Sequence, residues 1–344
     1  MVYLQNLSKK RDYFIATGVL YTLSYLYSQI RTYFEFGISH RASFTAVSDM
    51  ALKVTIPVDT TWQPGQHFFL RFIHLGLHAL TAHPFTIASV PATGVSRGRS
   101  KLVFYVQPRG GITGRLAAAT AQNPGLNVPV LLDGPYGGIK GKPLRNYDCG
   151  LIVACGAGAS LSLPFAMRAI ISSARRADTG ASPRTTQIVI ATRDSQLVRW
   201  YREALVEYMD ENSVERIPDD VTISVYETGN ARSLGGTEGS TSRDLEKSGE
   251  GGDEKTVGAE VGERDLGSDR NKERLPISVN RGRPDIASIV RDLSLQPNKS
   301  VGIAACGPAS VLRVVQDEAA AAQLRILHSR PGAREVYLHC EVFS

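Results

Sequence analysis

Cysteine is scarce in this sequence, and its placement does not suggest a metal site or a disulfide framework. The four cysteines, Cys149, Cys155, Cys306 and Cys340, form no CxxC pair. Two of them lie in apolar or glycine-rich runs, which is typical of reduced thiols in a reducing compartment. We therefore expect free thiols and no metal site.

Long runs of one charge are missing as well. The chain carries 39 Lys and Arg against 33 Asp and Glu, a formal net charge of +6 over 344 residues. It has no arginine-rich stripe or basic arm, which argues against nucleic acid as a partner. A weakly basic surface is compatible with a small anionic ligand that carries phosphates.

A hydrophobic run that would comfortably cross a membrane is also lacking. The charge-free run from Tyr13 to Ile30 (YFIATGVLYTLSYLYSQI) follows Lys9-Lys10-Arg11 and has no secretory cleavage site. It is near the lower length limit of roughly 17–25 residues for a spanning helix, and it is rich in Tyr, which favours the lipid–water interface. Within residues 1–37 we expect a membrane-proximal helix on the surface, a remnant of a span, or an amphipathic helix packed on the body.

The rest of the chain divides into two domains and an insertion. Residues 38–143 contain short strands broken by Gly and Pro, such as 51–56, 67–72 and 101–106, which predict a small antiparallel barrel. Residues 148–344 alternate buried strands with helices, which predicts a doubly wound parallel sheet. Within it, residues 230–275 contain no aromatic residue and are dense in Gly, Ser and charge, so we expect a disordered insertion.

Two glycine-rich turns carry the clearest chemical signal of the second domain. Residues 155–160 (CGAGAS) follow a predicted strand and open a helix, and residues 306–310 (CGPAS) follow another strand. Glycine lets the backbone approach a pyrophosphate, and a helix N-terminus supplies N–H groups and partial positive charge. Turns at the carboxyl ends of parallel strands meet at one edge of the sheet, so we expect a dinucleotide site there.

Taken in order, the turns and strands resemble a known family. The segments PGQ, HPFTIAS, RGGITGRL, DGPYGG, CGAGAS, GRPD and CGP resemble the flavin- and NADPH-binding half of the ferric reductase and NADPH oxidase superfamily, most of all fungal ferric-chelate reductases. The resemblance extends from about Tyr13 to Phe343, apart from the insertion. It implies a ferredoxin–NADP reductase-like fold: an antiparallel β-barrel FAD domain followed by an α/β doubly wound parallel-sheet NADP domain.

The resemblance also implies the cofactor sites, residue by residue. The segments that match the FAD site contribute His83, Pro84, Phe85, Thr86, Arg109, Gly111, Thr113, Gly134, Tyr136 and Gly137. Those that match the NADPH site contribute Gly156, Gly158, Ser160, Arg193, Arg283, Pro284, Cys306, Gly307 and Pro308. Arg193 follows a strand where a cation can meet a ribose 2′-phosphate, which favours NADPH over NADH.

Three residues are expected to act in catalysis. The resemblance places Thr86 near the reactive face of the flavin, Cys306 beside the nicotinamide, and Phe343 as an aromatic cover over the flavin. Two departures from the family pattern occur. Ala157 and Ala159 flank Gly158 where the family more often has Gly-Gly-Thr/Ser-Gly, and the chain ends at Ser344 where the family often has a further aromatic residue.

The implied activity is hydride transfer from NADPH to FAD, followed by release of single electrons to a ferric chelate or a haem. The superfamily passes these electrons to haems held by histidines on transmembrane helices, a domain that we expect this chain to lack. His74 and His78 fall in a barrel loop, where we expect no metal role. We expect membrane association with both cofactor domains facing the cytosol.

Three interpretations of the activity stay open at this point. The chain is part of a membrane ferric reductase or of an NADPH oxidase-type enzyme, or it is a stand-alone diaphorase that reduces chelated iron, quinone or dioxygen or docks on a separate haem subunit. The third interpretation is a non-catalytic paralogue that binds nucleotide and serves as an interaction partner.

Overall fold

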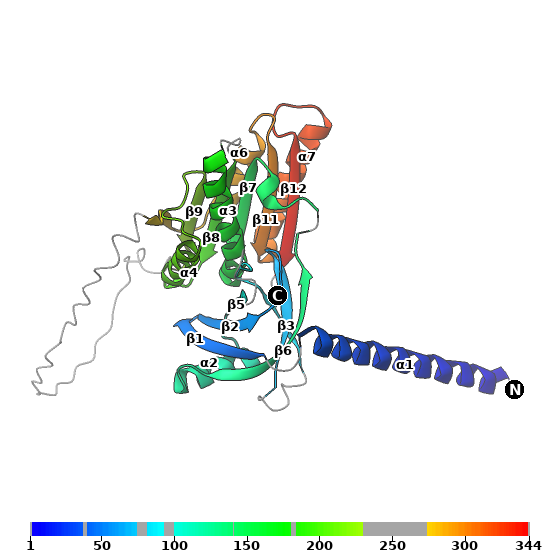
Figure 1. Ribbon diagram of the computed structural model, residues 1–344. Helices are drawn as coiled ribbons and strands as arrows, with labels where there is room; N and C mark the ends of the chain where they lie inside the picture. The colour runs from blue at the N-terminus through cyan, green and yellow to red at the C-terminus, as the bar shows by residue number, and fades with distance from the viewer. Residues whose placement is uncertain are drawn as a thin grey trace, which may run out of the picture.

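A computed structural model describes residues 2–36, 40–73, 81–92, 100–139, 141–179, 184–229 and 274–342. Two domains stand one above the other, and a long helix extends from the lower one (Figure 1). Each domain is built on a six-stranded sheet. The two sheets differ in strand direction, and this difference decides how each domain presents its site residues.

The lower domain is an antiparallel barrel. Its strands are β1 Arg41–Ser48, β2 Ala51–Val58, β3 Gln66–Phe72, β4 His83–Thr86, β5 Ser100–Val106 and β6 Asn127–Gly137, in the order β4-β3-β6-β1-β2-β5. Just after β4, Ala88 N donates to Val103 O of β5 at 2.7 Å, and Ser89 Oγ donates to Lys101 O at 2.8 Å. These bonds join the two edge strands, and α2 (Ile112–Gln122) packs beside β1.

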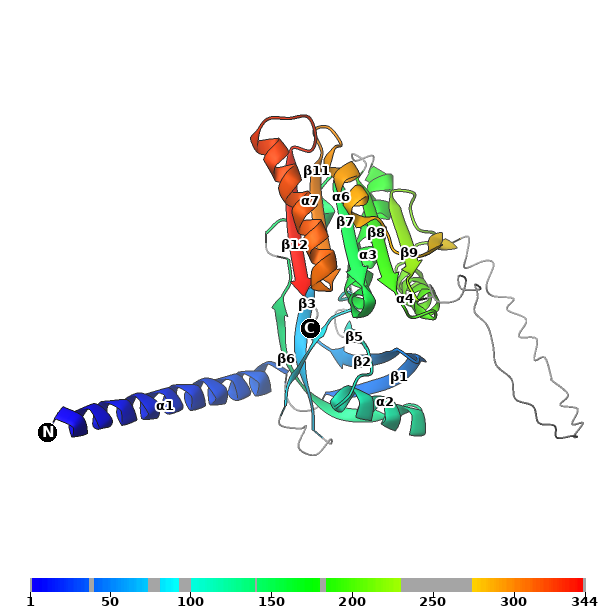
Figure 2. The same cartoon turned by 180° about the vertical axis from the view of Figure 1, so that it is seen from behind.

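The upper domain is a parallel sheet covered on both faces. Its strands are β7 Cys149–Cys155, β8 Thr185–Thr192, β9 Val221–Glu227, β10 Ile277–Arg281, β11 Ser300–Gly307 and β12 Glu335–Val342, in the order β10-β9-β8-β7-β11-β12. One face carries α3 (Ala159–Thr179) and α4 (Leu197–Glu211), and the other carries α6 (Ile286–Ser294) and α7 (Ala309–Leu327) (Figures 1 and 2). Both faces of β7 and β11 are buried, as their apolar runs require.

The fold predicted from the sequence is confirmed: an antiparallel domain precedes a parallel α/β domain. Most of the expected insertion, residues 230–273, lies outside the described residues. At its end the expectation was too long, because Leu275 is fully buried and Arg274 donates to Asp210 and to Glu215 O. Both residues belong to the packed domain.

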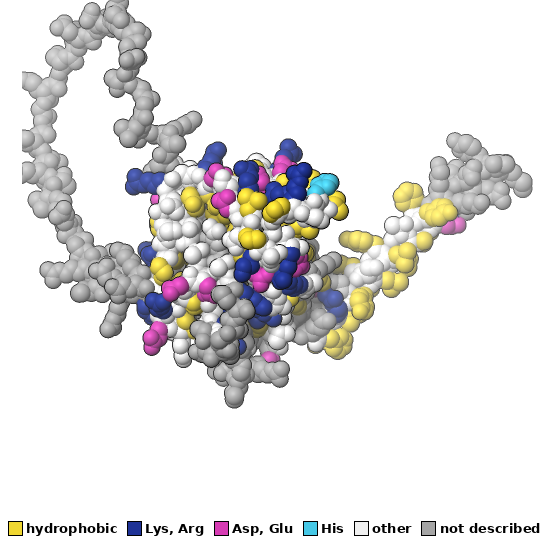
Figure 3. Space-filling model, turned by 90° about the horizontal axis from the view of Figure 1, so that it is seen from above, with side chains coloured by type: hydrophobic (Ala, Val, Ile, Leu, Met, Phe, Trp, Pro, Cys, Tyr) yellow, Lys and Arg dark blue, Asp and Glu magenta, His cyan; other side chains and the backbone are white. Residues whose placement is uncertain are grey.

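The N-terminal helix, α1 (Val2–Phe36), extends away from the body (Figure 3). The side chains of Tyr13, Phe14 and Tyr21 are each at least 75% exposed, so this part of the helix does not pack on the barrel. No helix among the described residues is long and apolar enough to cross a membrane. Of the three expectations for this segment, packing on the body is wrong for the described side chains from Tyr13 to Tyr27.

Candidate functional site

A cleft of about 870 Å³ opens between the barrel and the carboxyl edge of the parallel sheet. Its walls come from the turns after β7, β8 and β11, from the segment before α6, and from the barrel. Eight of the residues predicted from the sequence line it: Arg109, Gly156, Ser160, Arg193, Arg283, Pro284, Gly307 and Pro308. Because the strands are parallel, their carboxyl ends share one edge, which brings these distant segments together.

The turn after β7 is shaped for close approach to a ligand. Gly156 has φ +56°, and a Cβ placed on it would meet no atom within 4 Å. The short helix Gly156–Gly158 leads directly into α3, and Ser160 Oγ donates to Ala157 O at 3.0 Å. The 21-residue α3 presents its N-terminus here, which favours a bound anion. These residues therefore fit a dinucleotide pyrophosphate.

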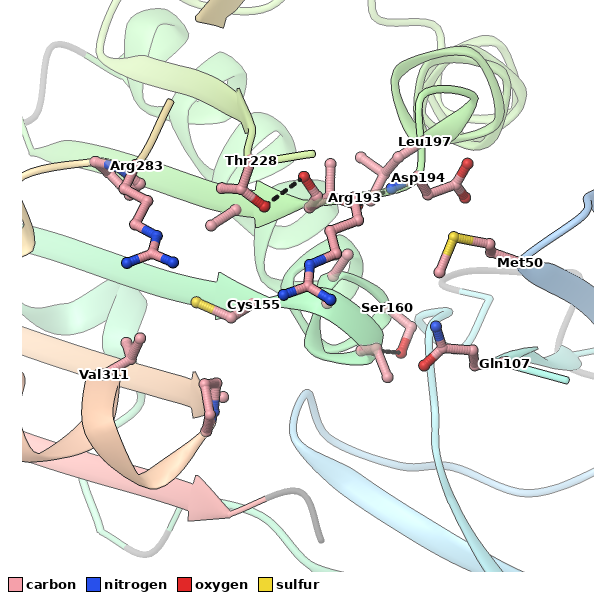
Figure 4. Close-up of a pocket in the computed structure, with 18 of the residues that line it drawn as sticks. Met50, Gln107, Cys155, Ser160, Arg193, Asp194, Leu197, Thr228, Arg283 and Val311 are labelled. Atoms are coloured by element: carbon pink, nitrogen blue, oxygen red, sulfur yellow. Dashed lines mark hydrogen bonds between the residues drawn. The ribbon is translucent and has the colours of Figure 1, made fainter. Parts of the chain in front are cut away.

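Two arginines supply positive charge to the same cleft. Arg193 follows β8 and Arg283 precedes α6, and both side chains are exposed and extend toward the cleft interior (Figure 4). Behind Arg193, Thr228 Oγ1 donates to Thr192 O at 3.0 Å and fixes the end of β9 against the end of β8. The donor set suits a second anionic group, such as a phosphate beyond the pyrophosphate.

Asp194 connects the cleft to the barrel and was missed by the sequence analysis. Its Oδ2 accepts hydrogen bonds from Ser48 Oγ at 2.8 Å and from Trp200 Nε1 at 3.2 Å, while Oδ1 accepts from Gln196 N at 2.9 Å. Beside it, the Trp200 ring stacks on Tyr105 of β5 with centroids 4.4 Å apart. The Ser48–Asp194 bond and the stacking of Trp200 on Tyr105 join distant parts of the chain, so no local sequence signal announces them.

The two cysteines of the glycine turns lie in different surroundings. Cys306 is fully buried in the core on the α3 side of the sheet and does not line the cleft, whereas Cys155 does. Burial raises the pKa of the Cys155 thiol to about 11. A Cβ on Gly307 would approach Cys155 Cβ to 3.0 Å. The predicted Cys306–Pro308 turn therefore contributes to the cleft through Gly307 and Pro308, and the accessible thiol is that of Cys155.

The predicted flavin residues of the barrel align across three neighbouring strands. In the ladder, Thr86 of β4 is opposite His67 of β3, and His67 is opposite Tyr136 of β6. Residues opposite one another point to the same face, so these three side chains share one surface. The rings of His67 and Tyr136 have centroids 6.1 Å apart, and that of Phe69 lies 5.9 Å from Tyr136. His67 and Phe69 were not predicted as site residues.

The side chains of the other residues of the HPFT segment point alternately to the two faces of strand β4. Pro84 is opposite Phe69 and shares the face of Thr86, whereas Phe85 is opposite the buried Phe68 and packs toward Phe72 and Phe104. His83 lies opposite Leu70, and its Nε2 is 2.9 Å from Thr81 Oγ1. Phe85 therefore packs against the barrel core, and Pro84 and Thr86 share the other face of this strand.

The start of α2 provides a second place for an anion. Gly111 caps the helix with φ +69° and no side-chain cap, so N–H groups of the first turn remain for a phosphate. Thr113 Oγ1 accepts a hydrogen bond from Arg109 N at 3.0 Å and holds this turn. Arg109 also lines the cleft. The turn fits the phosphate role predicted for it.

The DGPYG segment of β6 is packed tightly and touches α1. A Cβ on Gly134 would lie 2.8 Å from Phe68 Cδ1, so only glycine fits there. Arg31 of α1 forms an ion pair with Asp133 at 2.9 Å and also donates a hydrogen bond to the hydroxyl of Tyr136. That hydroxyl in turn donates a hydrogen bond to Asp133 Oδ1. Burial, followed by the Asp133 contact, raises the pKa of the Tyr136 hydroxyl. A Gly137 Cβ would lie 3.1 Å from His67 Nδ1.

Several expectations fall outside the part of the chain that can be described. Phe343, the predicted aromatic cover, lies there, as do His74 and His78. Gly158 is described and buried within the turn before α3. Among the described residues, no group of three or more His, Cys, Asp or Glu side chains could hold a metal ion.

Two family models match the chain. The model described as the ferric reductase NAD binding domain matches residues 147–320, and one described as an FAD-binding domain matches residues 39–140. A probable cell surface ferric reductase of Aspergillus oryzae is 27% identical over 215 residues, which is 58% of this chain and 27% of that protein. A probable ferric reductase transmembrane component of Candida albicans is 26% identical over 285 residues, 81% of this chain and 38% of that protein.

The chain thus spans between 27% and 38% of the length of these two curated relatives. Among solved structures, the ferredoxin-NADP+ reductase from Plasmodium falciparum gives a TM-score of 0.47 at 12% identity, covering 88% of this chain and 95% of that one. The two family models account for both domains in order. The chain therefore belongs to the ferric reductase family, of which it contains the FAD-binding and NAD-binding domains.

Proposed function

We propose that this chain takes a hydride from NADPH onto FAD and passes single electrons to a ferric chelate. The observation that carries the proposal is the cleft, where residues predicted from four separate segments of the dinucleotide domain meet Arg109 of the barrel. FAD supplies a hydride acceptor that releases its electrons one at a time. Family membership and the names of the relatives support the ferric acceptor.

The residues of the chain bind and orient the two nucleotides. The turn at Gly156 and the N-terminus of α3 would hold the pyrophosphate of the nicotinamide dinucleotide. Arg193 and Arg283 would bind the 2′-phosphate that distinguishes NADPH from NADH. The face formed by Thr86, His67 and Tyr136 would orient the flavin, with the turn at Gly111 holding its phosphates.

Selectivity between NADPH and NADH tests the role of the arginines. Under anaerobic conditions, NADPH should bleach the visible flavin band of the purified chain, and Arg193→Ala or Arg283→Ala should raise the KM for NADPH about tenfold or more. The KM for NADH should stay the same, because that nucleotide has no 2′-phosphate. Arg313→Ala, which removes an exposed arginine from α7, is the control and should change neither.

The acceptor is tested separately. After reduction by NADPH, the chain should reoxidise faster with a ferric chelate than with dioxygen or a quinone. Faster reoxidation by dioxygen or quinone favours an oxidase or a stand-alone diaphorase instead. Colourless protein that does not respond to NADPH even after reconstitution with FAD would support the non-catalytic paralogue.

We also propose that α1 attaches the chain to a membrane surface. The support is the row of exposed apolar and aromatic side chains on this helix between Tyr13 and Phe34. The intact chain should float with phospholipid vesicles in a density gradient, whereas a variant in which Phe14, Leu20 and Tyr21 are changed to Ser should not. Equal flotation of both proteins would contradict the proposal.

A further inference from the structure

A second cavity, of about 270 Å³, lies at the seam between the two domains and shares no lining residue with the cleft. Its walls come from Gln63 and Pro64 of the barrel, from the linking segment between Ile139 and Arg145, from α3, and from β7 and β8. Gly150 and Thr186 are opposite one another near the amino-terminal ends of β7 and β8. The nucleotide turns lie at the carboxyl ends of the same strands, so the two hollows open at different places on the sheet.

The walls of this cavity are largely apolar, and their polar side chains are those of Gln63, Thr186 and two arginines. Phe165, Leu144 and Ile152 contribute buried apolar surface, and Ile139 adds to it from the linking segment. Arg168, on the third turn of α3, and Arg145, on the short helix Leu144–Asn146, are the charged residues that line the cavity in the described part of the chain. The cavity therefore has an apolar part and a cationic part.

The positive charge at this cavity is not balanced by the protein. Arg168 Nε is buried and has no hydrogen-bond partner. Within the described ranges, Arg168, Arg145 and the nearby Arg175 form no ion pair with a carboxylate. Arg176, the next residue along α3, is paired with Asp220 at 3.1 Å, so the same helix also carries an arginine whose charge the protein does balance.

The electrostatic environment points the same way. Burial and the charges of Arg145 and Arg175 all lower the pKa of Arg168, and the phenol of Tyr208 is the group that opposes them. Glu211 acts on Tyr208 but forms no ion pair with the three arginines among the contacts described. Guanidinium groups stay charged in proteins, so clustering them without an acid is unfavourable until an anion binds.

We propose that this cavity binds a small organic carboxylate whose apolar body packs on Phe165 and Leu144 while its carboxylate binds Arg168 and Arg145. The volume is slightly below the 300–1,000 Å³ that is common for ligand pockets, so the occupant is small. A planar guanidinium fork donates two parallel hydrogen bonds to the oxygens of a carboxylate. The shape and charge of the cavity together select an amphipathic anion over a neutral molecule or a bare inorganic ion.

The place of the cavity gives its occupant a structural consequence. Phe165 of α3 lies close to the barrel, since a Cβ on Gly65 would be 3.5 Å from Phe165 Cζ. An occupant held between α3 and the linking segment adds contacts to both domains at once. Binding should therefore raise the thermal stability of the intact chain, as any ligand that binds only the folded state does.

Titration of the full chain with matched probes tests the proposal. Phenylacetate should bind in a saturable way, with a Kd of about a millimolar or tighter, and should raise the Tm. Phenylacetamide has nearly the same shape and no charge, so it should not bind. Hexanoate should bind as a second carboxylate with an aliphatic body, and inorganic phosphate should bind weakly.

Variants locate the binding. Arg168→Gln should weaken phenylacetate binding about tenfold or more, since a charge-assisted pair is lost, and Arg168→Lys should weaken it less. Arg176→Gln, on the same helix, and Arg193→Gln, in the cleft, should bind phenylacetate as the unchanged chain does. Without probe, Arg168→Gln should keep or raise the Tm, because it removes an unbalanced charge.

Five outcomes overturn the inference. Equal binding of phenylacetamide removes the role of the charge, and unchanged binding by Arg168→Gln places the probe elsewhere. Saturable binding of phosphate alone removes the role of the apolar walls. No saturable binding of any probe, or a clear fall in the Tm of unliganded Arg168→Gln, shows that the arginine has a structural role only.

Discussion

The two domains present their predicted site residues in different ways. In the dinucleotide domain, Gly156, Arg193, Arg283 and Pro308 lie beyond the ends of strands, outside the packed sheet, and all line one cleft. In the barrel, the predicted residues of the HPFT and DGPYG segments lie within strands, where Thr86 alternates with Phe85, which packs against the core, and Gly134 touches Phe68. The dinucleotide site is therefore added to a sheet that packs without it, whereas the barrel site is part of the packing.

This difference predicts how substitutions divide between stability and function. A change at the end of a parallel strand should alter nucleotide binding at small cost in the free energy of unfolding. A change inside the barrel strands should weaken flavin binding and also lower the free energy of unfolding, because the same residues support the core. The substitutions below test this division in order of decreasing effect on the free energy of unfolding.

The largest effect is expected for Gly134→Ala. The new Cβ would lie 2.8 and 2.9 Å from atoms of the buried Phe68 ring and 3.1 Å from His67 O. We expect a loss of about 2–3 kcal/mol in the free energy of unfolding, as for overpacked cores, together with loss of FAD. Urea unfolding and the flavin content of the purified chain would measure both.

Gly110→Ala is the matched control in the same domain. A Cβ there would meet no atom within 4 Å, and the residue is exposed. The free energy of unfolding should change by no more than about 0.5 kcal/mol. If Gly134→Ala were as mild as Gly110→Ala, the barrel site would be separable from the core and the comparison between the domains would fail.

An intermediate effect is expected for Asp194→Ala, which removes the acceptor shared by Ser48, Gln196 and Trp200. Donors left without a partner at the domain interface should lower the free energy of unfolding by about 2 kcal/mol. Because Ser48 belongs to the barrel, the rate of flavin reduction by NADPH should also fall, as the two sites lose their fixed relation. Urea unfolding and rapid-mixing kinetics would measure the two effects.

Glu207→Gln provides the comparison for that variant. This substitution breaks the ion pair between Glu207 and Lys53. Like the Ser48–Asp194 bond, that pair joins the two domains, but it lies at the solvent-exposed surface. Exposed pairs contribute up to about 1 kcal/mol, so stability and kinetics should change little. Equal effects of the two variants would show that Asp194 has no special part in joining the domains.

The extent to which the sequence predicted the molecule follows the same division. The parallel sheet and its cleft were predictable, because buried runs ending in glycine turns fix both the strands and the edge at which their loops meet. In the barrel, the HPFT segment pointed to the face that carries Thr86 but not to all the residues on that face, since His67 and Phe69 reach it through strand pairing. The role of Cys306 beside the nicotinamide stays a prediction; its side chain is buried, and the thiol that lines the cleft is that of Cys155, because one residue along a strand changes the face.

Contacts between distant segments could not be predicted at all. The ion pair of Arg31 with Asp133 and the Ser48–Asp194 bond each join residues about a hundred or more positions apart. Neither pair belongs to a periodic pattern or a local motif. Only the packing of α1 and of the two domains brings them together.

A smaller effect on stability is expected for Gly156→Ala in the cleft. The φ of +56° is unfavourable for alanine by about 1–2 kcal/mol, but the Cβ has open space and disturbs no core atom. The added methyl group would occupy the surface where the pyrophosphate is proposed to lie, so the KM for NADPH should rise. Steady-state kinetics together with urea unfolding would show the division directly.

Gly125→Ala isolates the backbone strain in that measurement. Gly125 has φ +85° with no atom within 4 Å of a Cβ, and it lies in a barrel turn away from the cleft. It should cost about the same free energy as Gly156→Ala and leave the KM unchanged. A raised KM in both variants would mean that the strain, and not the ligand surface, is responsible.

The smallest effect is expected for Asp148→Asn, at the edge of the parallel sheet opposite the cleft. Asp148 Oδ2 accepts hydrogen bonds from Ser300 N and Ser300 Oγ, both at 2.8 Å, and forms an ion pair with Arg334 at 3.1 Å. The Ser300 N–H above all holds the pKa of the Asp148 carboxyl below its ordinary value of 3.8. A lowered pKa in the folded state means that the stabilisation is complete above 3.8 and is lost as the pH falls below it.

Asp148→Asn should therefore lower the free energy of unfolding by about 1 kcal/mol at pH 7 and by less in acid, so that the two proteins converge as the pH falls. Asp59→Asn removes an exposed carboxylate of the barrel and is the surface control, which should change the free energy of unfolding by no more than about 0.5 kcal/mol at pH 7. The KM for NADPH should not change, because Asp148 lies at the amino-terminal end of β7 and Gly156 follows its carboxyl end. If the nucleotide site lies beyond the strand ends, a substitution at one edge of the sheet should change stability, and a substitution at the other edge should change nucleotide binding. A rise in the KM for NADPH in Asp148→Asn would contradict this independence of the two edges.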